Sequence, residues 1–410
     1  MLTFNPTRLA LVAALLATPA VHAAEPAAPA SAVQIGVASF NLAWAGSQKD
    51  FEQHAAVCNA VSWCDTRPKR GPGGMRPDDA AVKAAAQCVA DTERLAGGPE
   101  QAAMMAPCNA YLGRNSTTPP TGVDYAAKLA GLQATVDKLI ETQGVRVLAF
   151  QEVRSAEVVK TLLGRYADRF DVCDAPHEGF QTVAFAWDRS LSKEAGRCSV
   201  NRELAVVDNP GDPKARKVRP GLALELQLPG RRVSFLNVHL KSGCANIVPT
   251  PVYQARLLDD PATACTVLNR QVAPLERWLD SVGKQSPEYV LLGDFNRRID
   301  EEAAAAIKPE QVRIDGSNPL GAPKEDATGK VATRYLWQEL ADAGRPLTQV
   351  PLQADSACRG FTGLDHIVLS GPLAARQAPG LVSRKTAVVQ VPNQRLEASD
   401  HCPRSVTLNF

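Results

Sequence analysis

Apolar and polar residues follow two different periods along this chain, so both strands and helices are expected. Residues 34–44 (QIGVASFNLAW) alternate between apolar and polar side chains, which is typical of a strand with one buried face. Residues 125–144 place five aliphatic side chains, from Leu129 to Ile140, on one face of a helix. Gly144 supplies the expected end of that helix.

The remaining periodic segments predict a mixed sheet system with helices on its outside. Short apolar runs bounded by turn residues indicate strands, and a longer amphipathic run at 264–283 indicates a helix. Some strands are separated by turns and others by helices, which favours an α/β arrangement. The other expected elements are a helix that begins after Ser155 and strands at 145–150, 181–188, 222–228, 233–240, 289–296, 366–370 and 404–410.

The segment 45–122 interrupts this pattern and is rich in Gly, Pro and Cys. It contains one expected helix at 77–97, with acidic residues at its start and Gly97 at its end. We interpret the segment as a disulfide-tied insertion in a larger catalytic domain at 33–410, and not as a separate domain.

Length and composition set the broad class. A chain of 410 residues, 45% hydrophobic and 21% charged, can form one large α/β domain or two ordinary ones with ample core. The net charge is +2 and the pI is near 8.0. Many nucleic-acid-binding domains are more basic, with a pI above about 9. The basic clusters at 66–70 and 214–220 are of a kind found more often in solvated loops than in binding patches.

The first residues have the pattern of a secretory signal peptide, at 1–23. Arg8 precedes the apolar run 9–17, and small residues at 21–23 form a cleavage signal. The apolar run is shorter than the roughly 20 residues that a membrane span needs, and no later segment predicts a transmembrane helix. An Ala/Pro linker at 24–32 follows, so we expect a secreted or periplasmic protein.

Ten cysteines agree with an oxidising compartment. No CxxC pair or Cys/His knuckle is present in the sequence, so a zinc site is disfavoured. Spacing alone does not fix the pairing, and neighbours in sequence are our hypothesis. The expected bridges are Cys173–Cys198, Cys244–Cys265, Cys358–Cys402 and two within 58–108.

Polar residues suited to metal or phosphate chemistry stand at the ends of nearly every strong apolar strand. Taken singly, each has an ordinary explanation as a turn residue, a surface carboxylate or a core histidine. Six such coincidences favour one shared site at the rim of the sheets. The residues are Asn41, Gln151 with Glu152, His239 with Lys241, Asp294 with Asn296, Asp365, and Asp400 with His401.

These residue types fit the hydrolysis of a phosphate ester. Carboxylates with an amide make a hard oxygen site that suits Mg²⁺, with Mn²⁺ or Ca²⁺ as alternatives. Two histidines can act as acid, base or donors to phosphoryl charge, and a carboxylate such as Asp365 can orient an imidazole. The set therefore predicts metal-assisted attack of water on a phosphate ester.

The motifs FN, QE, NVHLKS, GDFN, LDHI and SDHCP, in this order, resemble those of the endonuclease/exonuclease/phosphatase superfamily, which includes deoxyribonuclease I-like and exonuclease III-like enzymes. The resemblance covers residues 33–44 and 123–410. It implies an α/β fold, a four-layer αββα sandwich of two packed mixed β-sheets flanked by helices.

The resemblance also implies roles for the site residues. The implied metal ligand is Glu152, with Asn41 and Asp400 close to the ion. Catalysis falls to His239, Asp294, Asn296, Asp365 and His401. His239 would contact the scissile phosphate, Asp294 would position or deprotonate water, Asn296 would hold a phosphate oxygen, and Asp365 would pair with His401. The division of acid and base roles between His239, Asp294 and His401 stays open. Substrate contacts are expected from Lys241, Arg297 and Arg298, and Gln181 is the expected partner of His239.

The superfamily acts on several phosphoesters. The motif VHLKSG resembles a motif of secreted bacterial nucleases, so we favour a nucleic acid substrate, DNA or RNA. A sphingomyelinase-like phosphodiesterase acting on a phospholipid headgroup, or a phosphomonoesterase, is the alternative. A membrane-contacting loop would support a lipid substrate, and Trp63 is the one residue that suggests it. A catalytically inactive binding protein is disfavoured because none of the motif residues is missing.

Overall fold

The computed structural model describes residues 1, 33–69, 71, 77–112, 118–211, 215–245, 264–304, 336–341, 344–353 and 363–410. The chain separates into two units, Met1–Ser31 and Ala32–Phe410, and every described element belongs to the second. The expected signal peptide and linker lie outside the described residues. None of the helices in the described ranges is long and apolar enough to cross a membrane.

Two six-stranded mixed sheets form the centre of the second unit. Only two pairs, β1 with β2 and β7 with β8, are parallel among the named strands. The first sheet has the order β11 (Arg384–Lys385), β12 (Arg404–Asn409), β1 (Gln34–Ala45), β2 (Val145–Val153), β4 (Thr182–Asp188) and β3 (Phe170–Asp174). The second has the order β5 (Arg197–Asn201), β6 (Gly221–Leu228), β7 (Arg231–His239), β8 (Glu288–Asp294), β10 (Asp365–Ser370) and β9 (Leu347–Gln349).

Strand β1 is joined to the other end of the described chain. It pairs antiparallel with β12, and Gln34 lies opposite Asn409. The second sheet uses a continuous part of the sequence, from β5 to β10, whereas the first is closed by the last strand.

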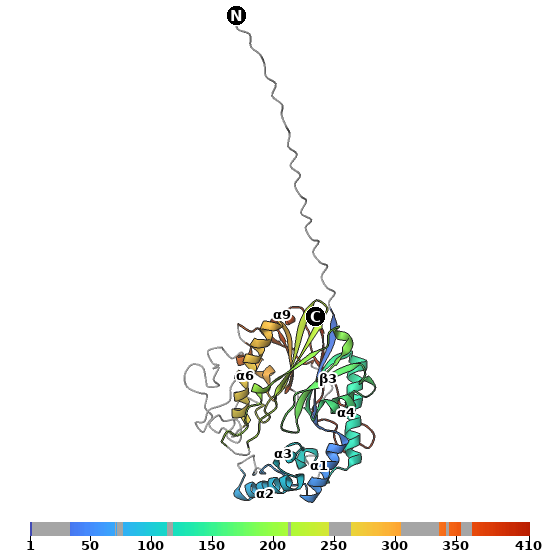
Figure 1. Cartoon of the computed structure of the whole chain (residues 1–410), viewed down its shortest axis with the longest axis vertical. Coiled ribbons are helices and arrows are strands. Elements are labelled where there is room, and N and C mark those ends of the chain that lie inside the picture. The colour runs from blue at the N-terminus through green and yellow to red at the C-terminus, as the bar shows by residue number, and fades with distance from the viewer. Residues whose placement is uncertain are drawn as a thin grey trace. The chain divides into compact units, whose positions relative to one another are not determined.

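Helices cover the outer faces of the two sheets, as Figure 1 shows. Helices α4 (Gly122–Gln143) and α5 (Ala156–Leu163) bury aliphatic side chains against β1 and β2. Helix α6 (Ala264–Gln285) and the short α8 (Leu336–Leu340) pack against the second sheet. Between the two sheets, side chains from both form a further hydrophobic cluster, which includes Phe185 and Phe235. The expected four-layer sandwich is therefore confirmed.

Several elements were not expected from the sequence. The strands β3, β5, β9 and β11 are short and carry weak patterns. The remaining short elements of the second unit, outside the insertion, are α7 (Ile299–Ala304), α9 (Gly371–Ala374), η3 (Gly164–Tyr166), η4 (Arg189–Leu191) and η5 (Arg202–Leu204).

The insertion contains more helix than the sequence suggested. Besides α2 (Asp79–Ala96), it holds α1 (Gln48–Ala60), α3 (Pro99–Ala103) and η2 (Cys108–Tyr111). Helix α1 buries only Phe51, His54 and Cys58, but it begins with a capping box, in which Ser47 and Asp50 bind each other's backbone N–H groups. The cap and the Cys58–Cys108 disulfide compensate for the small buried face.

Disulfides join the cysteines much as expected. The bridges are Cys58–Cys108, Cys64–Cys88, Cys173–Cys198 and Cys244–Cys265. Cys402 is also disulfide-bonded, and its expected partner Cys358 lies outside the described residues.

One expectation about the insertion was wrong. Trp63 is only 8% exposed, because it packs against the Cys58–Cys108 bridge and donates its indole N–H to Asn59. It therefore does not form a membrane-contacting loop.

Candidate active site

Three neighbouring strands of the second sheet place three site residues side by side. The parallel register of β7 and β8 sets His239 opposite Asp294, and the antiparallel register of β10 sets Asp365 opposite Asp294. Gly293 makes this close approach possible. Its φ is +139°, and a Cβ atom there would lie 2.0 Å from the carbonyl oxygen of Val238.

The first sheet supplies the facing side of the site. The Asn41 side-chain amide donates a hydrogen bond of 3.0 Å to Asp294 Oδ2, across the two sheets. Glu152 follows β2's apolar core and has a φ of +55°, a strained conformation for a residue other than glycine. His239 Nε2 lies 3.6 Å from both Glu152 Oε1 and Asp294 Oδ2. The two sheets thus gather Asn41, Glu152, His239 and Asp294 at one point.

A buried polar layer beneath the site holds the sheets in register. The Gln151 amide donates 2.7 Å to Asn237 Oδ1, and Asn237 donates to the carbonyls of Phe150 and Ala184. Ser39 donates to Gln151 Oε1. Because buried polar groups are costly without partners, these hydrogen bonds specify one alignment of the sheets.

His401 and Asp365 form the expected pair. His401 Nδ1 lies 3.0 Å from Asp365 Oδ2, and its Nε2 lies 3.9 Å from Asp294 Oδ2. Burial disfavours the imidazolium, but the charge and hydrogen bond of Asp365 outweigh it, with a contribution from Asp294, and raise the His401 pKa to about 10. His401 is therefore a cation at neutral pH.

His239 has the opposite electrostatic character. Burial, reinforced by the positive charges of Arg219, His401 and Lys241, lowers its pKa well below the ordinary value. It is neutral at physiological pH. Its Nδ1 has no hydrogen-bond partner within the described part of the chain. Gln181, which lies half-buried just before β4, therefore does not hold this ring, and the expected pairing is wrong.

The carboxylates of the site are buried close to one another, so a bound cation would stabilise their ionised forms. Burial raises the pKa of Asp294 to about 7, and nearby carboxylates add to the shift. Burial also raises the pKa of Glu152, and the exposed Asp400 raises it further. Like charges gathered in a buried site favour a divalent cation with oxygen ligands.

Two donor sets could hold that cation. Oxygen and nitrogen atoms of Asp294, Asp365 and His401 lie within 4.8 Å of one another. However, Asp365 and His401 already satisfy each other by hydrogen bonding. Glu152, Asp400 and the Asn41 amide oxygen, which accepts the backbone N–H of Ala43 at 3.0 Å, are all oxygen ligands, so they fit a hard cation better.

Asn296 and Lys241 lie at the same rim. Asn296 has a φ of +50°, donates its backbone N–H to Asp294 Oδ1 at 2.7 Å, and donates its amide to Leu240 O. It therefore fixes the turn that carries Asp294. Burial and the nearby Arg219 lower the pKa of the half-buried Lys241.

The two arginines after β8 have different environments. Arg297 is 0% exposed, forms an ion pair with Glu302, and donates to Cys244 O at 3.0 Å. It cannot reach a substrate from solvent, so the expected substrate contact is wrong for this residue. The Arg298 side chain is 43% exposed and pairs with Glu301 on the surface, where it remains a candidate for substrate binding.

Two cations near the site were not singled out from the sequence. Arg219 donates to Leu240 O, leaves its buried Nε without a hydrogen-bond partner, and interacts electrostatically with Glu152 and Asp294. The buried Lys128 ammonium donates to the carbonyls of Leu42 and Ala398, which flank Asn41 and the Asp400 loop. The signal for Arg219 was its place just before β6, an apolar strand that begins at the same rim.

Comparison with known proteins finds no family model and no curated protein that matches the chain. Among solved structures, it is similar to an endonuclease/exonuclease/phosphatase family protein from Bacteroides thetaiotaomicron, at 11% identity, with 93% of this chain and 99% of that chain covered and a TM-score of 0.43. It is also similar to ANGEL2, a 2′,3′-cyclic phosphatase, at 14% identity, 92% and 96% coverage and a TM-score of 0.43. TDP2 from Caenorhabditis elegans matches at 15% identity, 70% and 94% coverage and a TM-score of 0.39.

Proposed function

We propose that this protein is an exported, divalent-metal-dependent phosphodiesterase, and that it is a nuclease acting on DNA or RNA. The observation that supports this most is the meeting of Glu152 and Asn41 from one sheet with His239 and Asp294 from the other. A neutral histidine, a cationic histidine and buried carboxylates within one site suit hydrolysis of a phosphate ester.

Glu152, Asn41 and Asp400 are the residues that would hold Mg²⁺, or Mn²⁺ or Ca²⁺ in its place. When bound, such a cation polarises a phosphoryl oxygen and offsets the negative charge that develops on it. The raised pKa values of Glu152 and Asp294 support this assignment, because the cation would stabilise their ionised forms.

The remaining side chains divide the proton chemistry. Asp294 orients a water molecule and takes its proton as the water oxygen bonds to phosphorus. His401, the cationic donor beside Asp294, stabilises the phosphoryl oxygens and supplies a proton to the leaving oxygen as its bond to phosphorus breaks. Asp365 keeps the His401 ring in place. The neutral His239 donates a hydrogen bond to the phosphate from its Nε2.

Arg219 would bind a non-bridging oxygen of the same phosphate, because its cation lies near both Glu152 and Asp294. Lys241 and Arg298 would contact neighbouring phosphates of a polymer. These contacts favour a nucleic acid, and the burial of Trp63 removes the sequence feature that pointed to a membrane.

Export is supported by the four described disulfides, which persist in oxidising compartments. Mass spectrometry of the protein recovered from the periplasm or medium should find these bridges and cleavage near residue 23. Free thiols throughout would contradict export.

The decisive experiment uses purified protein with plasmid DNA, RNA, sphingomyelin and bis-p-nitrophenyl phosphate, with and without Mg²⁺. We expect nucleic acid cleavage that a chelator abolishes and Mg²⁺ or Mn²⁺ restores. Glu152→Gln should lose about 10²-fold or more in rate while keeping its melting temperature. Glu157→Gln, a surface carboxylate of α5, is the matched control and should remain active.

Two outcomes would contradict the proposal. Chelator-insensitive hydrolysis of every phosphoester would remove the metal assignment. Good turnover of sphingomyelin without nucleic acid cleavage would show that the protein is a lipid-headgroup phosphodiesterase and not a nuclease.

A further inference from the structure

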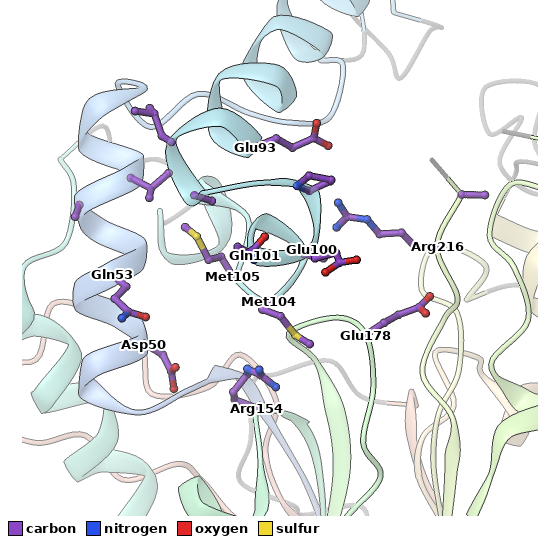
Figure 2. A pocket seen from close by; sticks show the side chains of 17 residues that line it. Asp50, Gln53, Glu93, Glu100, Gln101, Met104, Met105, Arg154, Glu178 and Arg216 are labelled. Carbon is purple, nitrogen blue, oxygen red and sulfur yellow. The ribbon is translucent and has the colours of Figure 1, made fainter. Parts of the chain in front are cut away.

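A large cleft lies between the insertion and the rim of the catalytic sandwich. Its volume is about 1290 Å³, and its walls come from α1, the α2–α3 segment, and the rim residues Arg154, Glu178 and Arg216. Figure 2 shows the Arg154 side chain reaching into this cleft, with Met104 and Met105 on the facing segment. The cleft is larger than many small-molecule sites, which hold roughly 300–1,000 Å³.

The cleft adjoins the catalytic carboxylates. Arg154 is two residues beyond Glu152, and its backbone N–H donates to Ala45 O at the end of β1. On the insertion, Tyr111 donates its hydroxyl to Trp44 O, and burial together with the charges of Tyr125, Asp50 and Glu152 raises its pKa. Asp50, whose charge also acts on Tyr111, lines the cleft.

Cationic groups connect the catalytic centre to the cleft. Arg154 forms no ion pair or side-chain hydrogen bond with any residue that the structure describes. Burial, with the positive charges of Arg219 and Arg154, lowers the pKa of His177 to about 4, which indicates that these groups lie near one another. Arg219 in turn faces Glu152 and Asp294. An anionic group next to the reacting phosphate would complement Arg154.

The opposite wall is apolar and acidic. Leu95 and Met104 are 38% and 36% exposed, and few other large apolar side chains among the described residues are as exposed. Methionine adapts to flat aromatic surfaces, and carboxylates such as Glu100 accept hydrogen bonds from amino groups of bases. These side chains suit the face and edge of a nucleobase.

The charge of the lining restricts what can enter. The lining contains four carboxylates, of Asp50, Glu93, Glu100 and Glu178, and two guanidinium groups, so it is acidic overall. A duplex carries one charge per about 1.7 Å of its axis and would be repelled by such a wall. One nucleotide, with its phosphate at Arg154 and its base on the apolar wall, meets no such penalty.

We infer that the cleft between the insertion and Arg154 binds one unpaired nucleotide adjacent to the scissile phosphate, so the enzyme selects single-stranded nucleic acid over duplex. This inference rests on the proposed nuclease function and extends it to a substrate class. The insertion then forms the wall of the substrate site that distinguishes single strands from duplex.

The experiment compares wild type, Arg154→Gln, and Arg202→Gln as a matched surface control on η5. Substrates are a single-stranded oligodeoxynucleotide, its duplex, and bis-p-nitrophenyl phosphate, which has no flanking nucleotide. Wild type should prefer the single strand to the duplex. In Arg154→Gln, the ratio of kcat/KM for the single strand to that for the small diester should fall about tenfold, the equivalent of one charge-assisted hydrogen bond. Arg202→Gln should keep the wild-type ratio.

Binding measured in chelator separates this inference from the proposed function. Fluorescence anisotropy should show weaker binding of a labelled single strand by Arg154→Gln than by wild type, regardless of turnover. A Glu100→Gln variant should bind duplex more tightly than wild type does. Equal loss of kcat/KM on all substrates, unchanged binding in Arg154→Gln, or equal wild-type rates on single strand and duplex would each overturn the inference. If wild type hydrolyses no phosphoester, the proposed function fails, and binding without cleavage would leave only a nucleotide-binding cleft.

Discussion

Replacing Arg297 with Gln should destabilise the whole protein, although the sequence places this residue beside the catalytic motif. The guanidinium is completely buried, is paired with Glu302, and donates to the carbonyl oxygen and sulfur of Cys244 at 3.0 Å each. Removing it leaves the Glu302 carboxylate in the interior with its charge uncompensated. That carboxylate also accepts the backbone N–H of Trp337 at 2.8 Å, so it cannot turn to solvent.

The size of the effect follows from these contacts. Breaking one side of a buried ion pair costs about 3–5 kcal/mol, because an unpaired charge remains in the interior. Burial already raises the pKa of Glu302 while Arg297 lowers it, so loss of the arginine raises this pKa further and favours protonation. Protonation limits the cost, and we therefore expect the lower half of that range.

The free energy of unfolding should be measured by urea titration of the disulfide-intact protein, followed by circular dichroism and fluorescence. Arg298→Gln is the matched control, and should change stability by less than about 1 kcal/mol because its ion pair is exposed. The double variant Arg297→Gln/Glu302→Gln should recover part of the loss, since no charge remains buried. If Arg297→Gln were as stable as Arg298→Gln and raised the KM for nucleic acid, the buried assignment would be refuted.

Other predictions concern the catalytic pair, pH and the β7–β8 contact. Asp365→Asn and His401→Ala should each lower kcat about 10²-fold, measured on bis-p-nitrophenyl phosphate, and a fully active Asp365→Asn would exclude the pair. Burial lowers the pKa of His54 to about 4 from 6.5, so the unfolded state binds the proton more tightly and stability falls as the pH drops through this interval. Between pH 7 and 5 this costs about 2 kcal/mol, and urea titrations of His54→Gln should show a weaker pH dependence than wild type. Gly293→Ala should lower the melting temperature strongly, since its Cβ would overlap the Val238 carbonyl; an unchanged melting temperature would contradict this.

The parts of the fold that could be predicted from sequence are those with strong, local patterns. The strands β1, β7 and β8 alternate or run apolar over their whole length, and α4 and α6 carry clear apolar faces. The edge strands β9 and β11 have only three and two residues, so their existence depends on a neighbouring strand and not on their own sequence.

Most residues that meet at the candidate site were predictable, but Arg219 was not singled out and the roles expected of Gln181 and Arg297 were wrong. Strand-end motifs identified Asp294, Asp365 and His401, because strands of a sheet end at a common rim. Adjacent arginines, however, look identical in sequence, and the burial of Arg297 is decided by Glu302 and Cys244, which only the tertiary structure brings to it. Similarly, Trp63 is covered by a disulfide whose partner Cys108 is far along the chain.

The pairing of β1 with β12 has a consequence for how the protein is made. Gln34 lies opposite Asn409, so β1 gains this neighbour only after β12 has been made, whereas its pairing with β2 can form earlier. Meanwhile, the strands β5 to β10 can form their own sheet from a continuous stretch of sequence. Asn41 and Glu152 belong to the sheet that closes last, and Asp294 and His239 to the other. A growing chain therefore lacks His401, which lies just before β12, until nearly all of the described elements have been made.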